Sequence, residues 1–225
     1  TVNENVGTGS IDAGTITDAD TVGTYGCTLG GADAADFACS ISGSTVNIAF
    51  AADPNYESPA DADTNNVYVV TVLINDGVAD DANGATTLTI TVADVNDITP
   101  TYTATSTTPS VTEGATAVDS NVAITDADTG DSNTCNLGGA DAGSFTCTLT
   151  GQTAYTLAFS SAPDYENPGS AGSSNEYTVT VSINDGSNDG ATITYTVTVA
   201  DANDQTPVYQ AADADDAITV NENVG

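Results

Sequence analysis

The sequence contains no lysine, arginine or histidine, whereas it contains 32 aspartate and glutamate residues and has a formal charge of −32. No carboxylate can therefore pair with a cationic side chain of the same chain, so metal ions, screening salt or protons must balance the acids. Calcium is the natural candidate, because hard divalent cations prefer clustered carboxylate and carbonyl oxygens. The alternative is a solvated acidic surface adapted to high salt.

The missing cationic side chains also exclude whole classes of function. Nucleic-acid binding needs Lys and Arg to displace counterions from phosphates, and direct electrostatic docking to anionic lipid needs them as well. Paired carboxylates can hydrolyse glycosides, but this chain has no cationic group to stabilise a developing anion. We therefore expect no nucleic-acid partner and no enzymatic activity.

Long apolar runs are absent too. No segment approaches the roughly 18 apolar residues that span a bilayer, so we expect no direct membrane insertion. The charged n-region of a signal peptide is missing, and we expect any targeting segment to lie outside this sequence. No Asn-x-Ser/Thr sequon occurs, which leaves the Ser- and Thr-rich stretches 106–110 and 170–174 as candidate positions for O-linked glycan.

Four cysteines form two pairs with the same spacing, Cys27 with Cys39 and Cys135 with Cys147. With no histidine, a zinc site would need all four cysteines from two distant parts of the sequence, so the pattern favours two local disulfides and an oxidising, extracytoplasmic setting. Each disulfide would close a loop of about 13 residues and stabilise the fold by about 3 kcal/mol.

The chain contains an internal repeat. Several segments recur at offsets of about 107 to 109 residues: 27–33 as 135–141, 55–57 as 164–166, 74–77 as 183–186, and 94–100 as 201–207. Residues 219–225 repeat residues 1–7 without a change. We predict one repeat over 1–100, a second over 101–207, and the start of a third over 208–225, as in a longer array.

Within each repeat, alternating residues predict β-strands. Over 87–92, Leu88, Ile90 and Val92 face one side and threonines face the other, which is typical of a half-buried antiparallel strand. Segments 67–74, 177–183 and 193–199 show similar patterns, and no segment has a convincing helical period. The predicted fold is all-β, with tandem immunoglobulin-like antiparallel β-sandwiches.

The acidic residues gather in short motifs at predicted strand ends. Taken singly, each favours a turn, because Asp and Asn side chains bond nearby backbone N–H groups. Asp76-Gly77 alone, for example, is typical of a hairpin turn. Together, however, five motifs recur in the same order in both repeats.

This joint pattern resembles the cadherin repeat family. The similarity rests on Glu4-Asn5, Asp-Ala-Asp at 18–20, Tyr56-Glu57, Asp76, and Asp-x-Asn-Asp-x-x-Pro at 94–100. The Gly-Gly-Ala-Asp segment leading to Phe37 or Phe145 looks like the cadherin-like repeats of large prokaryotic surface proteins.

The resemblance implies three calcium ions at each junction between repeats. The implied ligands of the first junction are Glu4, Glu57, Asp94, Asn96 and Asp97, the carbonyls of Val95 and Ile98, then Asp126, Asp128 and Asp185, and the Asn133 carbonyl. The implied half-site before the first repeat comprises Asp18, Asp20 and Asp76, and the one after the second comprises Glu113, Asp164, Glu166, Asp201, Asn203 and Asp204. In a continued array these two half-sites complete each other.

The sequence departs from the family pattern in two ways. Asn55 stands where the family has Asp and where the second repeat has Asp164, so we expect the outermost ion of the first junction to bind less tightly. Ile98 and Gln205 replace an Asn, which matters little if only the backbone carbonyl coordinates.

The sequence thus favours a calcium-stiffened extracellular or cell-surface repeat unit whose partners are neighbouring copies of the repeat, in a covalent array or a head-to-tail filament. The alternative is an adhesin module in which these repeats bind a ligand or a cell directly.

Overall fold

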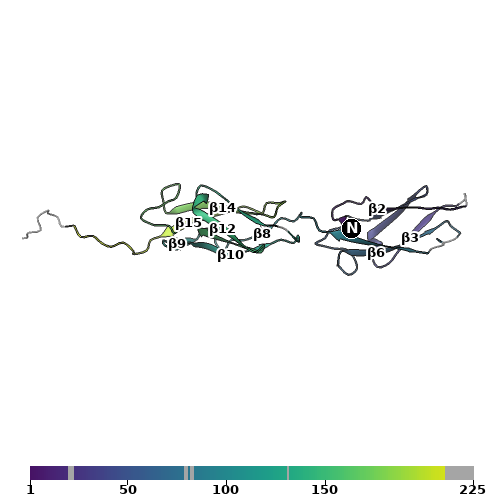
Figure 1. The fold of residues 1–225 in the computed structure, drawn as a ribbon, viewed down its shortest axis with the longest axis horizontal. Coiled ribbons are helices and arrows are strands. Elements are labelled where there is room, and N and C mark those ends of the chain that lie inside the picture. The colour runs from purple at the N-terminus through teal and green to yellow at the C-terminus, as the bar shows by residue number, and fades with distance from the viewer. Residues whose placement is uncertain (20–22, 79–80, 82–83, 131, 211–225) are drawn as a thin grey trace, which may run out of the picture.

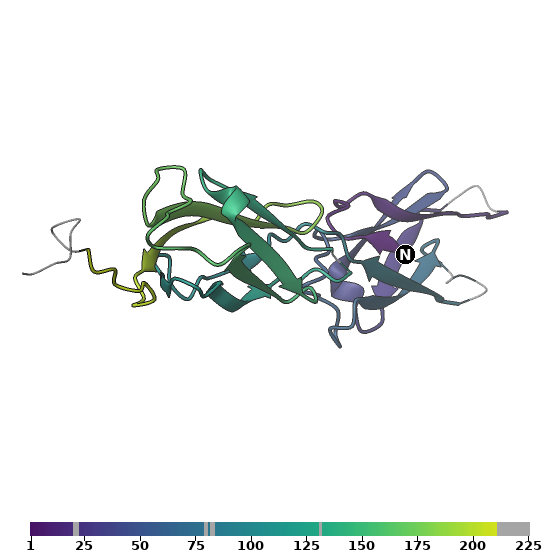
Figure 2. The ribbon, with the colours of Figure 1, turned by 60° about the vertical axis from the view of Figure 1, so that its left-hand side comes forward.

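A computed structural model of the chain describes residues 1–19, 23–78, 81, 84–130 and 132–210. Two β-sandwiches lie end to end as an elongated rod (Figures 1 and 2). The predicted all-β, immunoglobulin-like sandwich architecture is confirmed. Within the described part, no helix is both long and apolar enough to cross a membrane.

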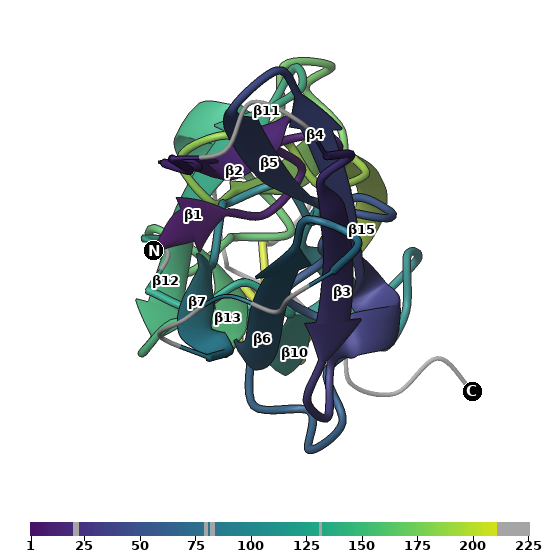
Figure 3. The ribbon, with the colours of Figure 1, turned by 90° about the vertical axis from the view of Figure 1, so that its right-hand side faces the viewer.

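The first sandwich has two facing sheets, seen from its end in Figure 3. Its elements are β1 (Val2–Asn3), β2 (Ser10–Thr15), β3 (Gly26–Gly30), the 3-10 turn η1 (Ala34–Asp36), β4 (Phe37–Ser42), β5 (Thr45–Phe50), β6 (Val67–Asn75) and β7 (Thr86–Ala93). One sheet has the order β1-β7-β6-β3, and the other has the order β2-β5-β4.

The second sandwich repeats this plan with one additional strand. Its elements are β8 (Thr101–Tyr102), β9 (Ser110–Thr112), β10 (Ala117–Thr125), β11 (Thr134–Gly138), η2 (Ala142–Ser144), β12 (Phe145–Thr150), β13 (Ala154–Phe159), β14 (Glu176–Asn184) and β15 (Ile193–Ala200). The sheets have the orders β9-β15-β14-β11 and β12-β13-β10-β8. The strand β8, which pairs with β10, has no counterpart among the described strands of the first sandwich. The repeat boundaries at 100 and 207 stay predictions.

Each sandwich encloses its own core. Phe37 and Phe50 stack with ring centroids 4.8 Å apart, and Tyr68 packs edge-on against both. Phe145 and Phe159 stack in the same way at 4.5 Å, with Tyr177 edge-on. These aromatic groups lie between the facing sheets, where alternating residues of the central strands are buried as the sequence pattern predicts.

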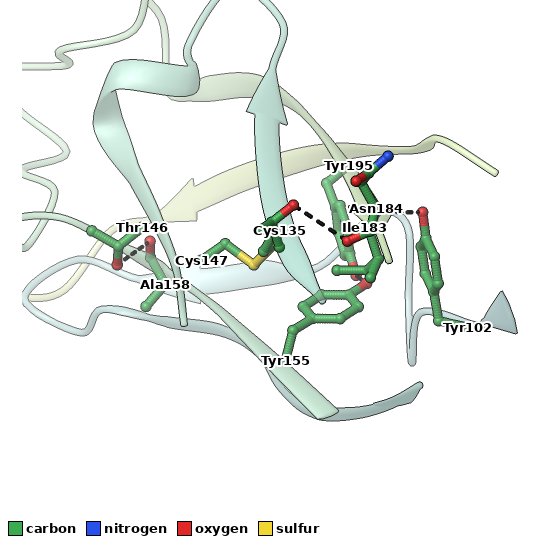
Figure 4. The surroundings of a disulfide bond; sticks show 10 residues. Tyr102, Cys135, Thr146, Cys147, Tyr155, Ala158, Ile183, Asn184 and Tyr195 are labelled. Carbon is green, nitrogen blue, oxygen red and sulfur yellow. Dashed lines mark hydrogen bonds between the residues drawn. A yellow bond between two sulfur atoms is a disulfide. The ribbon is translucent and has the colours of Figure 1, made fainter. Parts of the chain in front are cut away.

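Both predicted disulfides are present, Cys27–Cys39 and Cys135–Cys147. Cys27 lies on β3 and Cys39 on β4, which belong to different sheets. Each disulfide therefore ties the two sheets of its sandwich together, and Figure 4 shows the bond of the second sandwich beside its tyrosine-rich core.

The Gly-Gly-Ala-Asp segments anchor a loop in each sandwich. Asp141 is 7% exposed, and its carboxylate accepts hydrogen bonds from the backbone N–H groups of Ala171 and Thr178, both at 2.6 Å. Gly139 has a φ of +93°, and a Cβ there would lie 2.9 Å from the Thr178 carbonyl oxygen. The glycine thus allows the chain to pass close to β14, where the aspartate can reach the backbone amides. Asp33 bonds the amides of the first sandwich in the same way.

Substitution of Asp141 by alanine should leave two partly buried N–H groups, those of Ala171 and Thr178, without an acceptor. Since each such group costs about 1–3 kcal/mol, we expect D141A to lower the free energy of unfolding by about 2–4 kcal/mol and D141N to lower it less. Urea denaturation followed by circular dichroism measures the change. A D141A loss no larger than that of E176A, which removes an exposed carboxylate, would contradict this role.

Candidate metal centre between the two sandwiches

Carboxylates from distant parts of the sequence meet where the two sandwiches join. Ligand-capable oxygens of Glu4, Glu57 and Asp94 lie within 4.8 Å of one another, and so do those of Glu57, Asp97 and Asp128. Glu57 belongs to both groups, and Asp128 comes from the second sandwich. The two groups therefore form one acidic cluster across the junction.

Glu4 is positioned by the parallel pairing of β1 with β7. This pairing places Glu4 directly after β1, where its N–H donates to the Ala93 carbonyl at 3.0 Å. Its side chain is 2% exposed and accepts hydrogen bonds from the N–H groups of Val95 and Tyr56, both at 2.8 Å. The glutamate thereby fixes the linker that follows β7 against the loop that carries Glu57.

Hydrogen bonds also connect the linker to the second sandwich. The Ile98 N–H donates to Asp128 Oδ2 at 2.7 Å, and the Thr129 N–H donates to Asp94 Oδ2 at 2.7 Å. The Thr129 hydroxyl is also bonded to Asp94. Asn96 donates through Nδ2 to the Asp185 carbonyl at 3.2 Å. The two sandwiches are thus in direct polar contact.

Asp126, Asp128 and Asp185 face the linker from the second sandwich. Burial, followed by the charges of Asp128 and Asp185, raises the pKa of Asp126. Burial alone would raise the pKa of Asp185 too, but bonds from the N–H groups of Asn188 and Ser187 outweigh it and lower that pKa. Asp185 Oδ1 therefore accepts backbone hydrogen bonds within the hairpin turn, while Oδ2 is buried without a hydrogen-bond partner.

The cluster contains buried oxygens without hydrogen-bond partners. Ten buried side-chain oxygens in the described parts of the chain lack a partner, and seven of them belong to residues predicted for this junction: both oxygens of Glu57 and one each of Asp94, Asp126, Asp128, Asn133 and Asp185. A buried carboxylate oxygen without a partner is costly. Glu57, Asp94 and Asp128 also belong to the two groups of close oxygens, and such a set fits a hard cation, which prefers oxygen ligands.

The predicted ligands of the junction that remain are backbone carbonyls. Val95 and Ile98 direct their N–H groups to Glu4 and Asp128, and coordination by their carbonyls stays a prediction. Asn133 bonds to Gln152 through its backbone and its side chain, and its carbonyl as a ligand also stays a prediction.

The two predicted half-sites lie at opposite ends of the rod. Asp18 and Asp76 line a cavity at the end of the first sandwich, and Asp20 lies outside the described residues. Glu113, Asp164 and Glu166 bring oxygens within 4.8 Å of one another, while the remaining predicted residues of that half-site are exposed: Asp201, Asn203 and Asp204.

Three residues of the junction were not predicted from the sequence as ligands or linker contacts. Besides Thr129, Asn188 donates through Nδ2 to Asn96 Oδ1 at 3.1 Å, and Asn5 bonds to Asp97. Thr129 directly follows the Asp-Ala-Asp motif and Asn5 directly follows Glu4, so adjacency to a motif was the available signal. Asn188 lies in an ordinary hairpin loop, and nothing in its local sequence distinguishes it.

The acidity of Glu57 predicts how the metal-free junction responds to pH. Burial, together with the charges of Glu4 and Asp128, raises the pKa of Glu57 from 4.5 to about 7. Between pH 4.5 and about pH 7, the folded protein therefore binds more protons at Glu57 than the unfolded chain does. The contribution of protonated Glu57 to the free energy of unfolding is thus fully present below pH 4.5 and is lost as the pH rises through about 7. In chelator, the melting temperature should therefore rise as pH falls from about 7.5 to about 5.5.

Glu57→Gln should reduce this pH dependence, whereas Glu176→Gln should leave it unchanged. Thermal unfolding by circular dichroism at matched ionic strength provides the measurement. Equal pH slopes for the wild type and Glu57→Gln would show that general charge repulsion alone causes the effect.

Comparison with known proteins identifies the fold. No protein-family model matches the sequence, and no curated protein matches it. Among solved structures, protocadherin gammaB7 repeats EC3-6, described as a cis-dimer, are 22% identical with a TM-score of 0.63, and the match covers 94% of this chain and 47% of that one. Extracellular cadherin domains 1-5 of protocadherin gamma B2 are 21% identical with a TM-score of 0.64, covering 94% and 39%.

Repeats EC22-24 of mouse cadherin-23 are 21% identical with a TM-score of 0.56, and the match covers 89% of this chain and 61% of that one. The chain spans about half the length, or less, of the two protocadherin structures. The chain therefore has a cadherin-like fold of two consecutive β-sandwiches.

Proposed function

We propose that the chain is a calcium-stiffened, extracellular structural or adhesive repeat unit of a longer surface protein or filament. The observation that carries this proposal is the cluster of unpartnered carboxylate oxygens at the junction, contributed by both sandwiches. The Gly-Gly-Ala-Asp segments support a relationship to the cadherin-like repeats of prokaryotic surface proteins. The two disulfides support an oxidising, extracellular location.

The residues of the cluster fit calcium by their chemistry. Glu57, Asp94, Asp97 and Asp128 would hold it, with Glu4, Asn96, Asp126 and Asp185 completing the shell. Bound calcium would supply the positive charge that no side chain of this sequence supplies. The linker bonds of Ile98 and Thr129 already orient the two sandwiches, so neutralising the acids between them favours the extended arrangement.

The two ends of the rod support assembly with neighbouring copies. Glu113 is held by the N–H groups of Tyr165 and Ala202, as Glu4 is held by those of Tyr56 and Val95. The second sandwich therefore ends in the same arrangement that begins the junction. A following repeat that presents residues such as Asp18 and Asp76 would complete it.

Other functions find less support. A module that binds a ligand or cell directly should expose several aromatic side chains. In the described part of the chain, however, only Tyr165 and Tyr209 are exposed among the large aromatic residues. We propose no catalytic role. The stretch 106–108 is exposed and is open to O-linked glycan, whereas the Ser170 hydroxyl is buried and donates to the Ser174 carbonyl.

Removal of calcium should loosen the junction and destabilise the fold. We expect chelation at matched ionic strength to lower the melting temperature, and small-angle scattering to report a wider spread of shapes, because the acids of the cluster then repel each other. Magnesium should not restore either property, because it dehydrates reluctantly and demands a smaller octahedral site. Identical melting temperatures and scattering curves with and without chelator would show that the acidic residues are a general adaptation to high salt and not a calcium site.

Asp128→Asn isolates the junction in this experiment. Asn can keep the bond from the Ile98 N–H but loses the charge, so the calcium midpoint for thermal stabilisation should rise about tenfold or more. Glu176→Gln, which removes an exposed carboxylate outside the junction, should leave the midpoint unchanged.

Asn55→Asp should strengthen calcium binding at the first junction. Asn55 Oδ1 accepts the Ser58 N–H at 2.6 Å, and the equivalent Asp164 Oδ1 accepts the Asn167 N–H at 3.0 Å, so aspartate fits without rearrangement. With the added charge, the variant should melt higher than the wild type in calcium and lower in chelator. The same direction of change in both conditions would argue against coordination by this residue.

A further inference from the structure

A loop of the first sandwich carries acidic residues that its counterpart in the second sandwich lacks. Residues 60–66, Ala-Asp-Ala-Asp-Thr-Asn-Asn, directly precede β6 and correspond to residues 169–175, Gly-Ser-Ala-Gly-Ser-Ser-Asn, before β14. Asp61 and Asp63 therefore stand where the second sandwich has a serine and a glycine. We call residues 60–66 the acidic loop and residues 169–175 the neutral loop.

Both loops are held by the same contacts. Within the acidic loop, the Ala60 N–H donates to the Tyr68 hydroxyl at 3.1 Å and the Ala62 N–H donates to Asp33 at 2.8 Å. The tyrosine and aspartate at the matching positions of the second sandwich accept bonds from the neutral loop in the same way. The asparagine that ends each loop also donates to a tyrosine carbonyl, in both cases at 2.9 Å. The two loops are thus anchored alike in spite of their different charges.

The turn within each loop is closed by the side chain at one matched position. In the acidic loop the Asn65 N–H donates to Asp61 Oδ2 at 2.8 Å. In the neutral loop the Ser174 N–H donates to Ser170 Oγ at 2.9 Å. A hydroxyl therefore closes this turn as well as one carboxylate oxygen does, so the second oxygen of Asp61 and its charge are not needed to form the loop.

That second oxygen is buried and has no hydrogen-bond partner. Asp61 is 3% exposed, and its Oδ1 is one of the three unpartnered buried oxygens in the described part of the chain that lie outside the predicted junction residues. Burial alone would raise the pKa of Asp61, but the bond from the Asn65 N–H outweighs it and lowers that pKa. A buried anionic oxygen without a donor is costly, and the sequence contains no cationic side chain to offset it.

Other carboxylates lie close to Asp61. Its side chain is the main cause that raises the pKa of Asp63, so these two carboxylates are neighbours. Burial, followed by the charges of Asp33 and Asp61, raises the pKa of Asp36 in η1. The second sandwich has Ser144 at the position of Asp36. The first sandwich has thus concentrated negative charge at a place where the second has neutral residues and the same loop.

The spacing of the acidic loop suits a calcium ion. Asp61, Asp63 and Asn65 occupy alternate positions, and calcium-binding loops take side-chain oxygens from alternate residues. The Asn65 side chain already lies beside that of Asp63, because its Nδ2 donates to Asp63 Oδ2 at 2.8 Å. Calcium accepts irregular sets of oxygens, whereas magnesium demands a near-ideal octahedron.

We propose that the acidic loop binds a calcium ion of its own, separate from the junction. Asp61 Oδ1 and the Asp63 carboxylate would be the charged ligands, and the Asn65 amide oxygen and backbone carbonyls would be neutral ones. Asp63 and Asn65 are exposed, so water would fill the remaining positions. Asp33 and Asp36 would strengthen binding through their charge. The neutral loop, which has no carboxylate, would bind no ion.

Calorimetric titration of the full chain with calcium counts the ions. The double variant Asp61→Ser/Asp63→Gly carries the residues of the neutral loop, so it should keep the fold and bind one calcium ion fewer than the wild type. Glu176→Gln removes an exposed carboxylate beside the neutral loop and should leave the number of bound ions unchanged. An unchanged number in the double variant would overturn the proposal.

Transfer of the acidic residues into the second sandwich is the reciprocal experiment. A Cβ on Gly172 would contact only Ser174 Oγ, at an ordinary 3.6 Å, so a side chain fits there. The variant that combines Ser144→Asp, Ser170→Asp, Gly172→Asp and Ser174→Asn should bind one calcium ion more than the wild type. A folded variant with no additional ion would contradict the assignment of these residues as the site.

Hydrogen exchange locates the ion within the chain. The backbone amides of residues 60–66 should exchange more slowly in calcium than in chelator at matched ionic strength, because the ion would hold Asp61 and with it the bond from the Asn65 N–H. Exchange over residues 169–175 should be the same in both conditions. An equal response of the two loops, or no response of the acidic loop, would overturn the proposal.

Two variants separate this site from the junction. Asp128→Asn should weaken calcium binding at the junction but leave the calcium-dependent protection of residues 60–66 in place. Asp61→Ser/Asp63→Gly should remove that protection and retain the part of the calcium-dependent melting shift that Asp128→Asn removes. Loss of the protection in both variants would reject a separate site. Protection of the loop without any effect of Asp128→Asn on melting would reject only the calcium junction.

Discussion

The lack of any cationic side chain constrains every carboxylate of this protein. Within the described chain, backbone N–H groups are the main partners left, and they satisfy some acids completely. Asp141 and Glu113 each use both oxygens in this way, and the amide bonds lower the pKa of Glu113. Glu57 instead has two buried oxygens without partners and a raised pKa. Backbone bonding thus divides the acids into those whose oxygens are satisfied by amides and those, such as Glu57, whose buried oxygens have no hydrogen-bond partner.

Some parts of the structure could be predicted from the sequence and others could not. Alternating residues such as Leu88, Ile90 and Val92 predicted the strands because burial follows the same period as the pleat, and the cysteine spacing predicted both disulfides. The role of Asp33 could not be predicted, because its partners are backbone amides near positions 62 and 69 whose side chains carry no pattern. The contact between Asn96 and Asn188 was hidden for a similar reason, since it depends on how two sandwiches meet.

The two repeats share a plan but differ at one end, and sequence comparison alone does not reveal this. Residues 16–17 match 124–125, yet only the latter are paired with a neighbouring strand. The difference depends on β8, which precedes β9 in the second repeat, whereas the matching strand of the first repeat, β1, begins at Val2, so the positions that would match β8 lie outside this sequence. The two cores differ at this end as well. In the second sandwich the hydroxyls of Tyr155 and Tyr195 are hydrogen-bonded at 2.8 Å. In the first sandwich the smaller Val46 and Leu88 stand at the corresponding positions and line a cavity.

The junction and β8 are parts of one continuous segment. Asp97 and Ile98 lie in the acidic cluster, and four residues later Tyr102 fills the end of the second sandwich. Apolar burial of Tyr102 therefore holds the linker acids beside Asp128 even though their charges repel each other.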